Sequence, residues 1–236
     1  MKSLANTAIL ANSAAMSPVP AFVYNPPMEP RIDVIHQDDA LLVLNKQSGL
    51  LSVPGRPDGH KDCLESRIRE VFPSALTVHR LDMSTSGVCV MAMTPDAQRH
   101  LGLQFERRHT AKTYVARIWG DLPAGEGEVD EPLICDWPNR PKQMICYENG
   151  KKAQTHWKRL STGDGVTRVE LTPITCRSHQ LRVHMLHLGC PILGDELYAH
   201  DDARASADRL QLHAQSLTIH HPNGGERITF EAPCPF

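Results

Sequence analysis

Two short apolar runs, residues 75–78 and 88–93, enclose a polar segment, and both runs are typical of buried strands. The polar segment, residues 79–87, carries Arg80 and Asp82 and ends in Gly87. A carboxylate held between two core strands needs a partner, because an unpaired buried charge is very costly. Arg80, and Arg177 and Arg182 far downstream, could supply that partner. The segment therefore predicts either a functional carboxylate at Asp82 or an Asx turn with an exposed aspartate.

The downstream residues 175–184 form a second polar segment, which contains two arginines and two histidines: Arg177, His179, Arg182 and His184. Ser178 is a good N-cap, and it predicts a helix that runs to about Leu188 and stops at Gly189. Arg182 falls in the first turn, where a cation opposes the helix dipole but where anions also bind. This arginine therefore either belongs to a site or merely caps the domain.

Charge is distributed unevenly along a chain whose net charge is only −2. Between residues 99 and 117 five basic residues face one acidic residue, and between residues 137 and 159 six face one. These basic residues are Arg99, Arg107, Arg108, Lys112, Arg117, Arg140, Lys142, Lys151, Lys152, Lys158 and Arg159. Such segregation predicts one basic face, suited to RNA phosphates, on a nearly neutral protein. The alternative is a set of ordinary solvated side chains.

Composition excludes several classes of protein. The 236 residues are 41% hydrophobic, enough for a core, yet no apolar run approaches the roughly 20 residues that span a bilayer. Seven cysteines without a C-x-x-C pair predict reduced thiols and a cytoplasmic protein. His184 and His187 lack further ligands, so no metal site is expected. Residues 1–27, proline-rich toward their end, are expected to be a flexible N-terminal extension.

The coarse pattern predicts an α+β fold with a mixed, largely antiparallel central sheet, because strands arrive in runs more than in βαβ alternation. Helices are expected after Asp62, capped by that residue, from Thr94-Pro95 to about Arg107, and over residues 201–208. The expected strands are residues 32–35, 40–44, 113–118, 154–159, 166–171 and 211–219.

Three motifs together resemble the RluA family of pseudouridine synthases. They are HRLD…SG at residues 79–87, KTYVAR at residues 112–117 and RSHQLRVH at residues 177–184. Residues 133–143 further resemble the dual-specificity branch, which acts on large-subunit ribosomal RNA and transfer RNA. The resemblance implies that residues 28–236 form one catalytic domain, with helices and loops around an active-site cleft and no separate S4-type RNA-binding domain. Gln47 and Cys176 stand where the family usually has proline and glycine.

The resemblance also implies roles for individual residues. Asp82 is the catalytic aspartate, Arg182 pairs with it, and Tyr114 stacks on the base. Arg80 fills the space that the departing base leaves. The full set expected to bind substrate is His79, Arg80, Arg107, Arg108, Lys112, Arg140, Lys142, Lys151, Lys152, Arg177, His179 and Gln180. No cofactor, no metal and no membrane contact are expected, and the protein is expected to act on RNA as a monomer without an obligatory protein partner.

The implied reaction breaks the N1–C1′ bond of a uridine, turns the uracil and joins C5 to C1′. A carboxylate can do this as a nucleophile at C1′ or as a base at C2′, and the sequence leaves both routes open. A uridine in a folded RNA must first be flipped out. With only twelve aromatic residues, recognition should depend on phosphates and RNA shape. The non-enzymatic alternative is an RNA-binding or folding helper that uses the same cleft without turnover.

Overall fold

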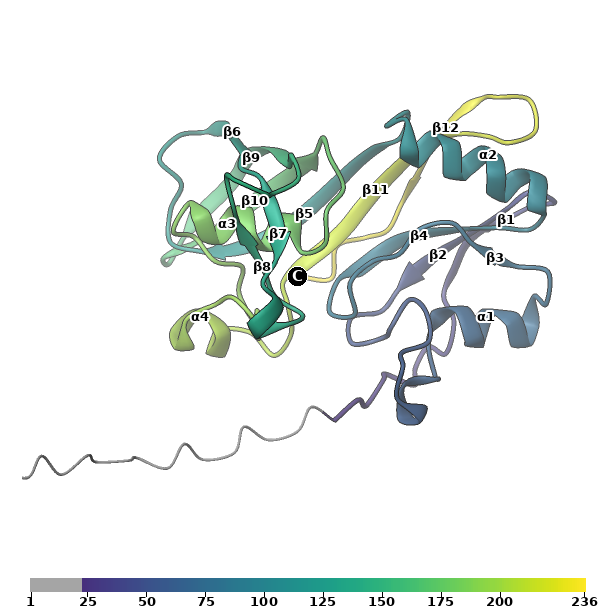
Figure 1. Ribbon diagram of the computed structural model, residues 1–236, viewed down its shortest axis with the longest axis horizontal. Helices are drawn as coiled ribbons and strands as arrows, with labels where there is room; N and C mark the ends of the chain where they lie inside the picture. The colour runs from purple at the N-terminus through teal and green to yellow at the C-terminus, as the bar shows by residue number, and fades with distance from the viewer. Residues whose placement is uncertain (1–22) are drawn as a thin grey trace, which may run out of the picture.

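One long mixed sheet organises the protein, whose computed structural model describes residues 23–236 (Figure 1). The strand order is β1-β2-β4-β11-β5-β10-β9-β6, with β3 also paired to β4 and β12 to β11. Only β4 and β11 pair in parallel; every other pairing in the sheet is antiparallel. The predicted α+β class with a largely antiparallel sheet is therefore confirmed.

The element bounds follow the chain in order. The strands of the main sheet are β1 Val34–Gln37, β2 Leu41–Lys46, β3 Leu76–Thr77, β4 Ser86–Ala92, β5 Ala111–Trp119, β6 Glu126–Asp130, β9 Gln154–Gly163, β10 Val166–Pro173, β11 Leu212–His220 and β12 Arg227–Glu231. A separate hairpin consists of β7 Leu133–Cys135 and β8 Gln143–Ile145. The helices are α1 Leu64–Val71, α2 Pro95–Glu106, α3 Gln180–His187 and α4 Asp201–Ala205, with two 3₁₀ turns at Asp58–His60 and Trp137–Asn139.

Strands β2 and β4 are apolar at nearly every position because both of their faces are covered. Successive side chains of a strand point to opposite faces. Leu41 and Val43 accordingly join the core that includes Leu101 of α2. Leu42 and Leu44 join the core that includes Ile68 of α1. Figure 1 shows α2 and α1 on opposite sides of these strands, so two continuous apolar runs build a three-layer half of the molecule.

The helix boundaries confirm one prediction and correct another. Thr94 caps α2, accepting from the Ala97 N–H at 3.2 Å, and Pro95 is the first helical residue. The cap of α1, however, is Cys63 rather than Asp62. Asp62 instead accepts from the Nε and Nη2 atoms of a fully buried Arg67, each at 2.7 Å. Leaving the buried guanidinium without a carboxylate would cost more free energy than leaving the helix without an oxygen cap.

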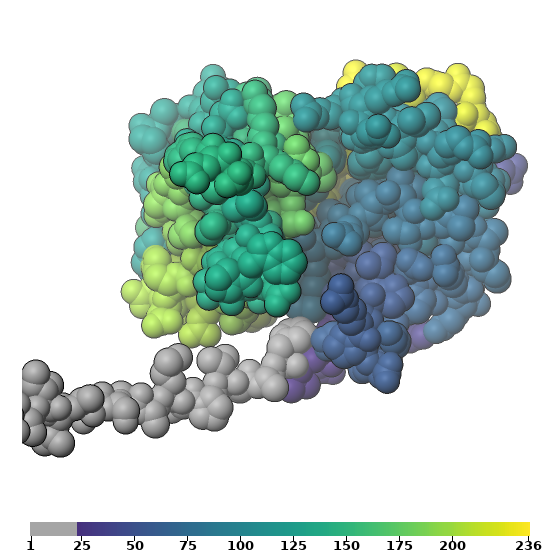
Figure 2. Space-filling model, viewed as in Figure 1, coloured from purple at the N-terminus to yellow at the C-terminus, as the bar shows by residue number. Residues whose placement is uncertain are grey.

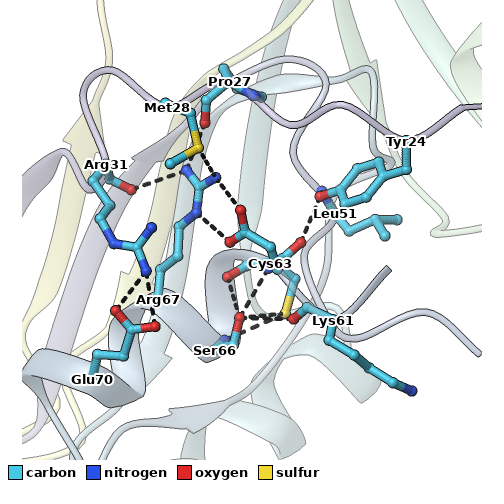
Figure 3. A network of polar contacts seen from close by, with 11 residues as sticks. Tyr24, Pro27, Met28, Arg31, Leu51, Lys61, Cys63, Ser66, Arg67 and Glu70 are labelled. Carbon is cyan, nitrogen blue, oxygen red and sulfur yellow. Dashed lines mark hydrogen bonds and ion pairs between the residues drawn. The ribbon is translucent and has the colours of Figure 1, made fainter. Parts of the chain in front are cut away.

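The segment before residue 28 is tied to α1 (Figure 3). Arg67 also donates to the carbonyl of Pro27 at 2.8 Å, and the hydroxyl of Tyr24 donates to the carbonyl of Asp62 at 2.8 Å. Tyr24 and Pro27 lie before the expected domain boundary, yet both are held by hydrogen bonds from the folded part. Residues 1–22 of the expected extension lie outside the described residues.

The other half of the sheet carries α3. Leu181 and Met185 of α3 are buried with Val169 and Leu171 of β10, and Leu188 packs against the same cluster. These three residues form the apolar face of α3. The predicted end near Leu188 is confirmed, since the helix ends at His187 and Leu188 is its C-cap, before a left-handed Gly189 (φ 75°). Strands β5 and β11 lie between this half and the half with α1 and α2 (Figure 1). No helix in residues 23–236 is both long enough and apolar enough to cross a membrane.

Candidate active site

A narrow cleft of about 80 Å³ lies where the two halves of the sheet meet, and Figure 2 shows the surface hollowed between them. The cleft contains eight of the site residues expected from the sequence. They are Arg80, Asp82, Lys112, Tyr114, Arg177, His179, Gln180 and Arg182. The first two come from the loop before β4, the next two from β5, and the rest from the segment that enters α3. The three separate motifs therefore converge on one site.

The loop that carries Asp82 is held in place by the loop after β2. The ammonium of the buried Lys46 donates to the carbonyl of Met83 at 3.0 Å, and the hydroxyl of Ser48 donates to the carbonyl of Ser84 at 2.6 Å. Ser52 both donates to the Leu81 carbonyl and accepts from the Leu81 N–H. These contacts leave the Asp82 carboxylate about one-third exposed, at 33% of its side-chain surface. The backbone is fixed while the acid faces the cleft, so the simple surface turn is not what the structure shows.

The expected ion pair between Arg182 and Asp82 is corrected by the structure. Arg182 donates from Nε to Oδ2 of Asp195 at 2.8 Å and from Nη2 to Oδ1 at 2.5 Å, and both side chains are buried. Asp195 also accepts from the N–H groups of Leu197 and Tyr198. This bidentate geometry satisfies a buried guanidinium better than the one-third-exposed carboxylate of Asp82 would. Arg182 still lines the cleft beside Asp82.

His179 is the side chain that comes nearest to pairing with Asp82, its Nε2 lying 4.0 Å from Oδ2. Burial is the main cause that lowers the pKa of His179 below its ordinary value, so the ring is neutral at pH 7. His179 also occupies the N-cap position of α3, with a left-handed φ of 54°. The prediction that Ser178 caps this helix is therefore wrong, because the chain enters α3 one residue later than a serine cap requires.

Tyr114 lies on β5, opposite Ala214 of β11 and Leu171 of β10. Burial raises the pKa of its hydroxyl above the ordinary value, so the group remains protonated. Its ring packs against two apolar clusters and also faces the cleft. The residue can offer a base a flat surface and a hydroxyl proton.

Gln180 lines the cleft, but protein groups use its whole amide. The amide nitrogen donates to the Gln154 carbonyl at 2.9 Å and to the Thr155 hydroxyl at 3.0 Å. The amide oxygen accepts from the Thr175 hydroxyl at 2.8 Å and from the Arg177 N–H at 3.1 Å. Both N–H hydrogens of the amide and both lone pairs of its oxygen are therefore used. Gln180 therefore fixes the loop before α3 and has no free polar atom to offer a substrate, contrary to the expectation.

His79 is likewise not placed to bind substrate. Its ring stacks on Phe105, with centroids 4.5 Å apart, and its Nε2 accepts from the Val90 N–H at 3.0 Å. Burial is the main cause that lowers its pKa to about 3. The ring thus joins the polar loop to β4 and α2, and it is absent from the lining of the cleft.

The remaining basic residues lie beside the cleft or on the β7–β8 hairpin. A larger hollow of about 480 Å³ adjoins the cleft, and Arg108, Lys112 and Arg177 line it. In the hairpin, Arg140 stacks over the exposed Trp137 at 4.7 Å, and Lys142 follows. Three further residues of the set are exposed on the surface: Arg107, Lys151 and Lys152.

Two departures from the family pattern can now be placed. Cys176 is exposed where the cleft and the adjoining hollow meet, and its φ is not positive, so its Cβ causes no left-handed strain. Gln47 lies in the loop that Lys46 holds, and its carbonyl accepts from the Lys46 ammonium at 2.8 Å. Cys176 therefore lines the cleft itself, whereas Gln47 does not.

Sequence reasoning missed Asp195 and Tyr198. Asp195 follows the apolar residues 192–193 and a left-handed Gly194, a context that predicts a buried carboxylate in need of a cation. Tyr198 places its ring under the Arg182 guanidinium, 5.0 Å from the ring centroid. No local signal identifies Tyr198, because its partners come from three other segments.

Side chains that could bind a metal do not cluster in the described part of the chain. Residues 23–236 contain no group of three or more His, Cys, Asp or Glu side chains that could hold a metal ion. The buried His184 uses its two ring nitrogens for hydrogen bonds to the Thr155 hydroxyl and the Glu131 carbonyl.

Comparison with known proteins agrees with this geometry. Residues 40–187 match the family described as RNA pseudouridylate synthase. The dual-specificity RNA pseudouridine synthase RluA of Escherichia coli is 58% identical over 214 residues, which cover 90% of this chain and 98% of that protein. The protein with the same name from Vibrio parahaemolyticus is 50% identical over 218 residues, which cover 90% of this chain and 87% of that protein.

Solved structures show the same similarity. Human RNA Pseudouridylate Synthase Domain Containing 1 aligns with a TM-score of 0.73 at 29% identity, covering 92% of this chain and 87% of that one. Human RNA Pseudouridylate Synthase Domain Containing 4 aligns with a TM-score of 0.71 at 27% identity, covering 86% of this chain and 88% of that one. The chain therefore belongs to the RNA pseudouridylate synthase family, whose members are isomerases that convert uridine in RNA to pseudouridine.

Proposed function

We propose that this isomerase modifies uridines in folded stem-loops of two RNA classes, large-subunit ribosomal RNA and transfer RNA, with Asp82 as its catalytic carboxylate. The observation that carries the proposal is the convergence of Asp82, Tyr114 and Arg182 on one cleft. The names of the similar proteins, each called dual-specificity, support the two substrate classes.

The chemistry requires one bond to break and one to form. The N1–C1′ bond of uridine breaks, the uracil turns, C5 joins C1′, and a proton leaves C5 while another arrives at N1. Asp82, which faces the cleft, either attacks C1′ or removes a proton at C2′. Arg182, held by Asp195 on the cleft wall, presents a fixed guanidinium group beside the reacting groups. No redox partner or energy source is needed.

The target nucleotide must leave its stack to reach Asp82. Its base would lie against the ring of Tyr114, because that ring forms a flat apolar part of the cleft. Arg80 is exposed at the cleft and is free to follow the base as it turns or to occupy the space behind it. The cleft is narrow, so one nucleoside enters at a time.

Phosphates flanking the target would meet the basic residues outside the cleft. Arg108, Lys112 and Arg177 border the adjoining hollow, and Arg140 and Lys142 project from the hairpin region. The enzyme is proposed to act on RNA as a monomer. Seven free cysteines support a cytoplasmic RNA-modifying enzyme.

Purified protein should be incubated with an isolated anticodon stem-loop and with a large-subunit RNA hairpin, and pseudouridine should be counted in each. We expect product in both. Product in only one class would contradict the proposed dual specificity while leaving the isomerase assignment intact. Tight binding of both RNAs without any product would favour the non-catalytic alternative.

A further inference from the structure

A chain of polar contacts, two hydrogen bonds and one longer electrostatic contact, leads from the β7–β8 hairpin to Asp82. The N–H of Gln143 donates to the hydroxyl of Tyr198 at 2.8 Å. That hydroxyl lies 2.7 Å from Nδ1 of His179, and Nε2 of the same ring lies 4.0 Å from Oδ2 of Asp82. Four residues from four separate segments thus form one line between an exposed hairpin and the catalytic carboxylate.

The proton positions along this line follow from counting donors. The Tyr198 hydroxyl accepts the Gln143 N–H on one lone pair and has a single proton of its own to give. Burial raises the pKa of Tyr198 to about 12, so the hydroxyl keeps that proton. In the arrangement that we propose below, this proton is donated to Nδ1 of His179, 2.7 Å away, and Nδ1 is unprotonated.

This arrangement implies one tautomer of His179. A neutral imidazole with an unprotonated Nδ1 carries its hydrogen on Nε2. That N–H faces Asp82, whereas the other tautomer would turn a nitrogen lone pair toward a carboxylate. The charged groups that face the ring are Asp82, Arg182 and Asp195, and Arg182 with Asp195 form a closed ion pair. The unpaired charge beside the ring is therefore that of Asp82.

The backbone of His179 indicates that the ring is held in place. Its φ of 54° is left-handed, a conformation that is strained for a non-glycine residue, and no side-chain cap compensates for it. The ring meets Tyr198 edge to face, with centroids 5.6 Å apart and planes at 84°. Strain of this kind persists only where surrounding contacts over-determine the conformation.

We propose that Tyr198 and His179 are positioning residues, through which the hairpin holds the Asp82 carboxylate in its reactive orientation. The inference rests on the proposed catalytic role of Asp82. At 4.0 Å the Nε2–H contact is electrostatic and longer than a direct hydrogen bond. It closes to a hydrogen bond if RNA on the hairpin moves Gln143 and Tyr198 toward the cleft. Docking of RNA and orientation of the acid are thereby linked.

The test compares Tyr198→Phe with Tyr147→Phe, an exposed tyrosine that serves as the matched control. Nitrogen-15 NMR of the His179 ring, assigned with His179→Gln, reports which nitrogen carries the hydrogen. We expect an Nε2–H ring in the parent and in Tyr147→Phe, and a mixture of tautomers in Tyr198→Phe. Single-turnover pseudouridine formation should fall about tenfold in Tyr198→Phe, the loss of roughly one hydrogen bond, with unchanged RNA affinity.

A second pair of variants addresses the donor itself. His179→Gln retains an N–H that can reach a carboxylate, whereas His179→Leu does not, so the glutamine variant should turn over faster than the leucine variant. An Nδ1–H ring in the parent protein, or parental turnover in Tyr198→Phe, would overturn the inference. An active Asp82→Asn protein would instead overturn the proposed role of Asp82, so the two failures are distinguishable.

Discussion

Arg182 donates two hydrogen bonds to Asp195, at 2.8 and 2.5 Å, and both side chains are almost completely buried. Two further backbone N–H groups complete the shell of the carboxylate. The charge of Arg182 is therefore balanced before any RNA arrives. The Asp82 carboxylate, by contrast, has no direct arginine partner among the described residues; the basic side chain nearest to pairing with it is that of His179, at 4.0 Å.

This pairing predicts a large stability loss in Asp195→Asn. The substitution keeps the shape but leaves a buried guanidinium uncompensated, which should reduce the free energy of unfolding by about 3–5 kcal/mol. Urea unfolding followed by circular dichroism measures the change. The control is Asp96→Asn, which removes an exposed carboxylate that pairs with Arg99 and should have little effect. Equal stabilities of the two variants would show that the buried pair contributes nothing.

A pair of glycines provides opposite predictions. Gly87 has a φ of 111°, and a Cβ there would lie 2.2 Å from the carbonyl oxygen of Ala214, where β4 and β11 run in parallel. Gly87→Ala should cost roughly 3 kcal/mol or more and disturb the strand that follows Asp82. Gly102, within α2, has open space around the same position, so Gly102→Ala should gain about 0.5–1 kcal/mol. Thermal unfolding should shift in opposite directions.

Much of the fold could be predicted because the central strands show regular patterns of apolar residues. Strands β2, β4, β5, β10 and β11 were each expected within a few residues, since their buried positions alternate or fill both faces. Strands β6, β7, β8 and β12 were not expected. In β6 only Val129 is buried, and the strand exists because it pairs with the edge of β9. Such edge strands depend on a partner distant in sequence.

In the candidate site, too, local features could be predicted and contacts between distant residues could not. Asp82, Tyr114 and Arg182 could be grouped from motifs, because each motif is local. The pairing of Arg182 could not, because Asp195 lies in a loop that reaches the helix only in three dimensions. His79 and Gln180 were wrongly expected to bind substrate because they stand inside the motifs. Their polar atoms instead make hydrogen bonds to groups distant in sequence, such as the Val90 N–H and the Gln154 carbonyl, which the motifs do not reveal.

Acid should destabilise the protein partly through His79. Burial lowers its folded pKa to about 3, below the 6.5 of an unfolded histidine. Between these two pKa values only the unfolded chain binds a proton at His79. The contribution of His79 to the free energy of unfolding is therefore complete above pH 6.5 and is lost as the pH falls toward 3. The slope is at most about 1.4 kcal/mol per pH unit.

The variant His79→Gln keeps an acceptor for the Val90 N–H but cannot titrate. Its free energy of unfolding should therefore fall less steeply than that of the parent from pH 6.5 to pH 4. His184 and His213, whose pKa values are also lowered mainly by burial, remain to give the residual slope. Identical slopes in variant and parent would rule out titration of His79 in this window.

RNA affinity should respond to salt through the basic residues outside the cleft. Replacing any one of Arg107, Arg108, Arg140, Lys142, Lys151 or Lys152 with alanine should weaken binding and flatten the slope of log K against log salt by about one unit. Turnover of bound RNA should change little. Arg204→Ala is the control, because this exposed arginine already pairs with Glu196 and Asp201. An unaltered slope in paired variants of both clusters would contradict the basic face.

The sharpest prediction concerns Asp82→Asn. Asparagine preserves size and most hydrogen bonds but removes the charge, so turnover should be abolished while RNA affinity stays the same or improves. Because Arg182 is paired with Asp195 and not with Asp82, the variant should keep nearly all of its folding stability. Single-turnover assay and filter binding on one preparation measure both quantities. Pseudouridine formation by folded Asp82→Asn protein, after deamidation back to aspartate is excluded, would refute the catalytic assignment.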